Sequence, residues 1–422
     1  MTILETFAAA LLAAPAGADA QRIAEKLQLH LLDTKGAMIA GAASAEGRAL
    51  AAGSAGALSL FGSSILDQIA LSVAQTRLTE VDDIHLASCA TVGSVIVPVA
   101  LALTEATGAS NARRDAGLLA GYDAMVRLGC AVDGARILYK GIWPTYLLAP
   151  VGAAACSAAI LGLDEAKTAD ALAIALGQIS GAAGGPAGGR NGRWLYAGWA
   201  AASGVRAALA ARDGFGGDRT LLDGDWFLKT HAIAFDAGKL AGAPGGSLLE
   251  MSIKPWCTAK QASSALAGFT DLLDEGLAPA DIAVMRVYVP AAYRGMIAHQ
   301  PPGRIGRIVS IAWQCAVAAF HREALYDIER VDFSGDPDFA ALVKKVEVLE
   351  DPALATHFPA RYPARVEAET AGGVLREKTV LDAPGDPARA VSLAQVEAKF
   401  LRVCSAVLGE DKARNALEGA RH

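Results

Sequence analysis

Apolar residues recur every three or four positions through roughly the first 240 residues, which is the spacing of one face of an α-helix. Almost no stretch of this half alternates apolar and polar residues in the way that a half-buried strand does. We therefore expect an all-α region here. The clearest helical patterns cover residues 22–41, 65–76, 114–130, 164–180 and 199–212.

The pattern changes after residues 240–250, LAGAPGGSLLE, where Pro and Gly cluster. Beyond this stretch the spacing predicts a mixture of helices and strands. The predicted helices are 261–276, which ends at Gly276, and 309–322. The predicted strands are 282–289, 344–350 and the two arms of 365–380, which Gly372 and Gly373 join as a hairpin.

The chain ends in a further helical pattern, residues 393–409. Ser392 and Gln395 at its start have the arrangement of a capping box. A terminal helix that follows a sheet is expected to pack back on the α region. The expected fold is thus mainly α. It has a large all-α domain, residues 1–246 with 390–422, and an inserted α+β lid domain, residues 247–389, with a small antiparallel sheet.

Composition raises the possibility of a membrane protein, because 53% of the residues are apolar and 19% are charged. The two long uncharged runs, 86–104 and 141–163, consist largely of Ala, Gly, Ser and Thr with interior prolines. They contain no sustained Leu, Ile or Phe stretch of the kind that spans a bilayer. We expect buried helices that cross closely, and no membrane association.

The remaining bulk properties favour a cytoplasmic protein. The first five residues carry Glu5 and no Lys or Arg, unlike the start of a signal peptide. Six scattered cysteines without a CxxC pair predict neither a disulfide framework nor a zinc ribbon. A net charge of −6 and the lack of a basic stripe argue against a nucleic acid partner.

The glycine-rich segment 181–193, GAAGGPAGGRNGR, has two glycines at the spacing of a phosphate-binding loop. Arg190 and Asn191 stand where that motif needs Lys and Ser or Thr, so nucleotide binding is not favoured. Arg190 or Arg193, together with backbone amides, could instead hold a carboxylate. The alternative is a plain loop between helices.

Two other segments contain side chains that could bind a ligand or transfer a proton. Asp82, Asp83 and His85 supply oxygen and nitrogen atoms, but no second cluster lies at metal-binding spacing, so no metal is expected. A helix cap is the simpler interpretation. Lys254 and Lys260 flank a proline and an aromatic residue just after the boundary, where they could neutralise a polycarboxylate or provide a base. They could equally be surface lysines.

Several sequence segments are informative because of the order in which they occur. They are LLDTKGAMIAG, DDIHLAS with VIVPVALALTEATGAS, AGYDAMVRLG, GAAACSAAILGLDEAKTADALAIALGQISG, LYAGWAAASGVRAALAARDGF, and KPWC at the boundary. As an ordered set they resemble the MmgE/PrpD family, which includes 2-methylcitrate dehydratase, cis-aconitate decarboxylase and iminodisuccinate epimerase. The resemblance implies a helical domain with an α+β lid, no cofactor, a homodimer, and an active site between the domains.

Carried over by position, the resemblance places Asp82 and Asp83, Thr91, the turn at Trp143, Arg193 and Lys254 at or beside functional positions. The chain also departs from the family. Thr91 and Val92 replace a His-Pro pair, Trp143 replaces a histidine, Arg193 replaces a lysine, and the histidine downstream of Lys254 is missing, with Lys260 nearby. Because arginine almost never gives up its proton, fixed cations and neutral groups replace imidazoles that can shuttle protons.

The expected function is therefore that of a lyase or isomerase that removes a proton α to a carboxylate of a small polycarboxylate, as 2-methylcitrate dehydratase does. The alternatives are an epimerase of an amino- or imino-dicarboxylate and a non-catalytic carboxylate-binding protein. The candidate catalytic residues are His85, Lys260, Asp83 and Tyr146. The candidate substrate-binding residues are Lys254, Arg193, Thr91, Trp143 and Arg190.

Overall fold

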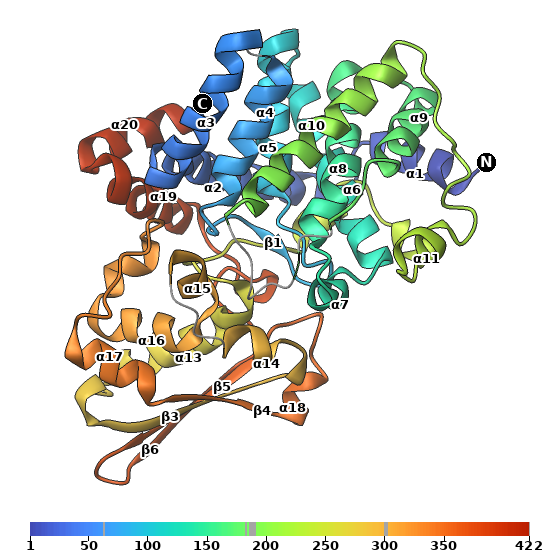
Figure 1. The fold of residues 1–422 in the computed structure, drawn as a ribbon. Coiled ribbons are helices and arrows are strands. Elements are labelled where there is room, and N and C mark those ends of the chain that lie inside the picture. Colours follow the sequence, from blue (N-terminus) through green and yellow to red (C-terminus); the bar gives the residue numbers. More distant parts are fainter. Residues whose placement is uncertain (62–63, 182–183, 185–190, 299–302, 422) are drawn as a thin grey trace.

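The computed structural model describes residues 1–422 apart from 62–63, 182–183, 185–190, 299–302 and 422 (Figure 1). A large helical part lies above a smaller part that contains a sheet, so the expected mainly α fold is confirmed. The helical part begins with α1 (Ile3–Leu12), α2 (Asp19–Ala43), α3 (Ala45–Phe61), α4 (Ile65–Arg77), α5 (Gly93–Thr107), α6 (Asn111–Ala131), α7 (Gly134–Ile137), the 3-10 turn η1 (Leu138–Lys140), α8 (Pro144–Leu161), α9 (Glu165–Leu176), α10 (Arg193–Arg212), α11 (Trp226–His231), η2 (Ala237–Leu240) and α12 (Gly246–Leu249).

Helix α8 forms the centre of the helical part and packs against α5, α6, α9 and α10. It is long and apolar enough to cross a membrane, but 89% of it is buried inside the protein. Most of α5 is buried as well. Both uncharged runs therefore contribute core helices, as their small residues and interior prolines predicted.

Glycines let α10 lie unusually close to its neighbours. A Cβ atom on Gly198 would overlap the carbonyl oxygen of Ala70 in α4, and one on Gly204 would overlap the carbonyl oxygen of Pro150 in α8. Backbone atoms of the two helices thus touch at each crossing, which only the missing side chain permits. The close crossings expected from the Ala and Gly content are present.

The sheet part differs from the expectation in one respect: its four-stranded sheet is mixed and not antiparallel. The strand order is β4-β3-β5-β6, with β3 parallel to β4 and the other pairs antiparallel. Helices α14 to α17 separate β3 from β4 in the chain, and such a crossover returns the second strand parallel to the first. The elements are β2 (Met251–Ser252), α13 (Lys260–Asp274), η3 (Pro279–Asp281), β3 (Ile282–Val289), α14 (Ala291–Ile297), α15 (Arg304–Val309), α16 (Ile311–Phe320), η4 (Arg322–Tyr326), α17 (Pro337–Lys344), β4 (Val346–Glu350), α18 (Pro352–Ala355), β5 (Ala364–Thr370), β6 (Leu375–Val380) and η5 (Pro387–Arg389).

The chain passes between the two parts twice, and the two passages are bonded to each other. The Ile253 N–H donates to the Gly385 carbonyl at 3.0 Å, and the Ser252 hydroxyl donates to Asp386 at 2.8 Å. Gly385 has φ 87°, and a Cβ there would overlap the Ile253 carbonyl, so glycine is required at this point.

A short two-stranded ladder adds a further link across the chain. Strand β1 (Ile84–His85), which directly follows the acidic segment, pairs with β2 in antiparallel register, with Ile84 opposite Ser252 and His85 opposite Met251. The stretch that bears Asp82 is thereby held next to the stretch that bears Lys254. The helical patterns of the first half gave no sign of this strand.

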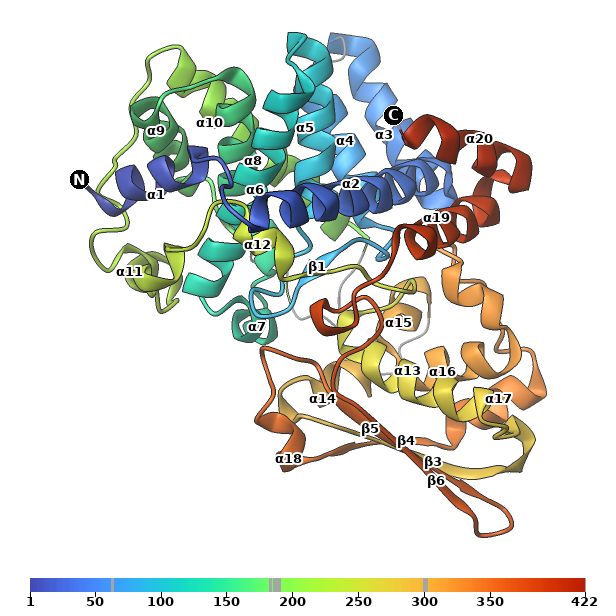
Figure 2. The ribbon, with the colours of Figure 1, turned by 180° about the vertical axis from the view of Figure 1, so that it is seen from behind.

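The chain ends in two helices, α19 (Leu393–Leu408) and α20 (Glu410–Ala420), where one was expected. Gly409, with φ 81°, separates them. Ser392 and Gln395 form the predicted capping box. Both helices pack on α2 of the helical part, beyond the sheet part from which the chain returns (Figure 2).

We predict that Gly204→Ala destabilises the protein by about 1–3 kcal/mol, because the added methyl group pushes α10 away from α8. Gly53→Ala is the matched control. Gly53 also lies in a helix, but nothing is within 4 Å of its Cβ position, so stability should rise by up to about 1 kcal/mol. Chemical denaturation measures both, and an equal effect of the two changes would contradict the close crossing.

Candidate active site

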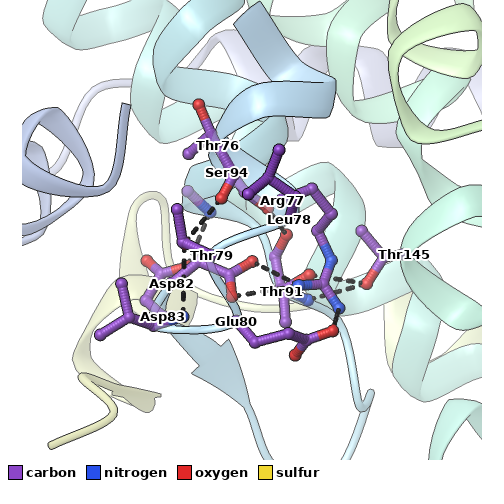
Figure 3. Close-up of polar contacts among 12 residues, drawn as sticks. Thr76, Arg77, Leu78, Thr79, Glu80, Asp82, Asp83, Thr91, Ser94 and Thr145 are labelled. Atoms are coloured by element: carbon purple, nitrogen blue, oxygen red, sulfur yellow. Dashed lines mark hydrogen bonds and ion pairs between the residues drawn. The ribbon is translucent and has the colours of Figure 1, made fainter. Parts of the chain in front are cut away.

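A buried carboxylate, Glu80, lies just beyond the end of α4. Arg77, the last residue of that helix, donates to Glu80 Oε1 at 3.0 Å and to both Asp82 oxygens at 3.1 Å (Figure 3). Glu80 has φ 55°, a left-handed conformation that is uncommon for residues other than glycine. The backbone thus takes a sterically unfavourable turn that directs both carboxylates to one guanidinium.

Two more cations reach Glu80 from distant parts of the chain. Lys254 Nζ lies 3.3 Å from Glu80 Oε2 and 3.3 Å from Asp82 Oδ1. Arg193 Nη2, from the first residue of α10, lies 3.3 Å from Glu80 Oε1. Burial opposes the charged form of Glu80, but Arg77, Lys254 and Arg193 outweigh it and lower the pKa of the carboxyl below its usual range.

The cluster carries excess positive charge, because three cations share two carboxylates. The ends of four helices add to it. Thr91 lies two residues before α5, Thr145 is in the first turn of α8, Arg193 begins α10 and Lys260 begins α13. A helix N-terminus carries roughly half a positive charge and unpaired N–H groups. The surroundings of the cluster therefore favour an anion.

A cavity of ≈ 50 Å³ lies within this group, between the helical part and the sheet part. The helical part contributes Arg77, Glu80, Thr91 and Arg193 to its wall. The sheet part contributes α13 and residues of α14 and α15. We call this space the ion cavity.

Thr91 and Trp143, both expected to bind substrate, line the ion cavity. The Thr91 N–H donates to the Thr145 hydroxyl at 3.0 Å, and the two hydroxyl oxygens lie 2.9 Å apart. The Arg193 guanidinium lies over the rings of Trp143 and Trp194, 4.7 Å and 4.2 Å from their centres. Trp143 thus packs on the cation without offering a titratable group.

Lys260 also lines the ion cavity, and it forms a very close ion pair with Asp386. Asp386 further accepts hydrogen bonds from the Ser252 hydroxyl and the Ala383 N–H. Burial lowers the pKa of Lys260, while Asp386 acts in the opposite direction. Of the expected site residues, the structure therefore brings Lys254, Arg193, Thr91, Trp143 and Lys260 together.

His85 does not join them. Neighbouring residues of a strand point to opposite faces, and in β1 it is Ile84 that lines the ion cavity. The His85 ring accepts a hydrogen bond from the Ser88 N–H at Nδ1, and its Nε2 lies 3.2 Å from Glu250. The imidazole thus faces away from the cations.

Glu250 lines a separate cleft of ≈ 790 Å³. That cleft is larger than the ion cavity, but Asp123 and Asp133 pair with two of its cations, Arg127 and Arg136. It offers no comparable excess of positive charge, so the ion cavity remains the better candidate for an anion site.

Asp83 and Tyr146 also lie outside the wall of the ion cavity. Asp83 is buried behind β1, where it accepts hydrogen bonds from the Tyr122 hydroxyl and the Gly93 N–H and lies 2.7 Å from His30 Nδ1. Tyr146 stacks on Trp143 and lines a neighbouring pocket. Arg190 lies outside the described residues.

The sequence interpretation missed Arg77, Glu80 and Asp386. A charged Arg and Glu within RLTEVDD, at the end of an apolar helix, were a detectable signal for the first two. Asp386 lies in a Pro- and Gly-rich turn, where a capping role is the ordinary expectation. In the described part of the chain, no three His, Cys, Asp or Glu side chains are grouped as they would be around a metal ion.

Two protein-family models match the sequence. The MmgE/PrpD N-terminal domain matches residues 5–236, and the MmgE/PrpD C-terminal domain matches residues 262–421. The chain belongs to the MmgE/PrpD family. The match to the C-terminal domain includes α19 and α20, so in this MmgE/PrpD protein the C-terminal sequence domain ends on the helical part.

A cis-aconitate decarboxylase-like protein of Aspergillus oryzae is similar to part of this MmgE/PrpD chain. It is 30% identical over 154 residues. The match covers 35% of this chain and 32% of the relative, so it spans about a third of either protein.

We predict that Glu80→Gln lowers the free energy of unfolding by about 3–5 kcal/mol, since it removes the negative charge shared by three buried cations. Glu323→Gln, at an exposed side chain, is the control and should change stability by less than about 0.5 kcal/mol.

The stability that Glu80 contributes should also depend on pH. Because the folded-state pKa of Glu80 is lowered, its contribution is complete above the unfolded value of about 4.3 and is lost as the pH falls toward the folded value. Denaturation at pH 7 and pH 3 should show a smaller gap between wild type and Glu80→Gln at pH 3. A constant gap would contradict the ionised state of Glu80.

Proposed function

We propose that this protein is a cofactor-independent lyase or isomerase that binds a small di- or tricarboxylate between its two parts and removes a proton α to a carboxylate. The observation that carries the proposal is the excess of buried positive charge around the ion cavity, where three cations share two carboxylates. Membership of the MmgE/PrpD family supports it. So does the similarity to a protein named for the decarboxylation of cis-aconitate.

Arg193 is the proposed anchor for a substrate carboxylate. Its Nε and Nη1 are buried and have no hydrogen-bond partner within the described part of the chain. A buried donor without a partner costs about 1–3 kcal/mol, and a substrate carboxylate oxygen would satisfy one of these N–H groups with a charge-assisted hydrogen bond. Lys254 would neutralise a second carboxylate as a point charge.

The ion cavity is small for such a ligand. A water molecule needs about 10–15 Å³ of comparable space, so ≈ 50 Å³ holds a few waters or one carboxylate group. A complete polycarboxylate needs the sheet part to move away from the helical part as it enters. In the proposed catalytic state the two parts have closed again around the bound substrate, so that water is excluded and the cations act at full strength.

Lys260 is the proposed base. Of the two lysines, Lys254 contacts two carboxylates and a carbonyl oxygen, whereas Lys260 faces one carboxylate and burial lowers its pKa. The α C–H bond of the substrate breaks, and its proton moves to Lys260 Nζ beside Asp386. The electron pair of the broken C–H bond spreads onto the substrate carboxylate that Arg193 and Lys254 hold. Delivery of a solvent proton to the opposite face gives an isomerase, and departure of a β-hydroxyl as water, with the proton from Lys260, gives a lyase.

A non-catalytic carboxylate-binding protein is the second candidate. Two observations favour it: His85 faces away from the ion cavity, and Trp143 occupies part of its wall. In that case anions bind at Arg193 and Lys254, and no proton is removed.

The decisive experiment is proton NMR in D2O with 2-methylcitrate, citrate, cis-aconitate, iminodisuccinate and tartrate isomers. We expect deuterium exchange or product formation with at least one of them. Lys254→Ala should lower that rate by about 100-fold or more, because one charge-stabilising donor is lost. Lys229→Ala, at an exposed lysine of α11, should leave it unchanged. Binding without exchange across the whole panel would favour the second candidate.

We also predict that kcat/KM rises with pH, because the neutral amine of Lys260 is the active form. The midpoint should lie below the ordinary lysine value of about 10.4, since burial lowers the pKa of Lys260. Lys260→Arg keeps the charge but removes the base, so it should lower kcat by about 10²–10⁴-fold. If Lys260→Arg kept the rising pH profile, the base would be a residue other than Lys260.

A further inference from the structure

A second pocket, of ≈ 350 Å³, lies beside the ion cavity. Tyr146 lines this pocket and Trp143 lines the ion cavity, and their rings are stacked at 5.5 Å with an angle of 11°. The Gly181 carbonyl, also at the second pocket, accepts a hydrogen bond from the backbone N–H of Trp143 at 2.7 Å. The stacked rings of Trp143 and Tyr146 thus lie between the two spaces.

The lining of the second pocket is uncharged in all its described residues: Tyr146, Gln178, Ser180, Gly181, Tyr196, Trp199, Ala200 and Ser203. We call it the aromatic pocket. Its outer wall consists of Tyr196 and Trp199, which are 46% and 58% exposed, with ring centres 6.1 Å apart. A pocket lined by aromatic rings with a few hydroxyl and amide groups is the usual composition of a small-molecule site.

Helix α10 places this wall close to the proposed carboxylate anchor. Tyr196 and Trp199 follow Arg193 by three and six residues, which is about 4.5 Å and 9 Å along the helix axis. The proposed carboxylate anchor and the outer wall of the aromatic pocket thus lie on neighbouring turns of one helix.

Tyr146, between the two spaces, carries a polar group. Its hydroxyl is buried and has no hydrogen-bond partner in the part of the chain that the structure describes. Burial raises the pKa of Tyr146 to about 12, so the hydroxyl keeps its proton and remains a donor. The charged groups nearest to this hydroxyl are Arg77, Arg193, Glu80 and Asp82, and a polar atom of a ligand bound among them would satisfy it.

From these observations we infer that the aromatic pocket is a substrate subsite, which takes a planar, uncharged group of a molecule whose carboxylates bind at Arg193 and Lys254. The inference rests on the proposed function and narrows its substrate class to dicarboxylates with an aromatic or similarly planar substituent. The small ion cavity supports it, because that space takes little more than a carboxylate. For a ligand to bridge both spaces, the Trp143 ring must turn away from Tyr146, which breaks the hydrogen bond from its Nε1 to the Gly184 carbonyl.

The test is calorimetric titration of the full chain with succinate and with 2-benzylsuccinate, which carries the same two carboxylates and one ring. We expect the second ligand to bind about ten-fold more tightly. Trp199→Ala should abolish this preference and leave the succinate affinity unchanged. Phe215→Ala is the matched control, because Phe215 is also an exposed aromatic residue but does not line the aromatic pocket.

The outcomes separate the two proposals. If succinate binds but 2-benzylsuccinate binds no more tightly, the subsite is wrong and the proposed function stands. If neither dicarboxylate binds, the proposed function fails, and the subsite fails with it. Light scattering on Trp199→Ala completes the test: a lost oligomer with an unchanged ligand preference would show that these rings contact a second copy of the chain, and would overturn the inference.

Discussion

The charge of one buried carboxylate, Glu80, holds the candidate site together. Arg77 at the end of α4, Arg193 at the start of α10 and Lys254 beyond the first domain passage all contact it. Without that negative charge, Asp82 would be the one carboxylate of the cluster left to offset three cations, in a medium of low dielectric constant where like charges repel strongly. The left-handed backbone at Glu80 is a local cost that the ion pairs offset. The cations are therefore already in position before any anion arrives.

Helices such as α2, α4 and α19 were predictable because they bury one side, and a buried side leaves a period of 3.6 residues in the sequence. The capping box at Ser392 and the hairpin at Gly372 and Gly373 were predictable because local chemistry determines them. The direction of β4 was not. A strand pattern carries no sign of whether its partner runs parallel, and here the long helical connection after β3 decides it.

The site was predictable only in part. Family resemblance pointed to Lys254 and Arg193, and both contact the same carboxylate. Glu80 is 113 residues from Arg193 and 174 from Lys254 in the sequence, so no local spacing could reveal that they meet. His85 shows the opposite difficulty. Its position in the sequence was suggestive, but a strand of two residues turns its ring toward Glu250, and a shift of one residue would have turned it toward the cations.

The two chain passages between the parts have a mechanical consequence. They lie side by side, joined by the bond from Ile253 to the Gly385 carbonyl, and the chain returns to α19 on the helical part. A body tied at two adjacent points can swing about the line through them but cannot slide or twist freely. Those two points therefore define a hinge axis. Lys254 follows Ile253 directly and so lies next to this axis, whereas α14 and α15 are farther from both passages along the chain.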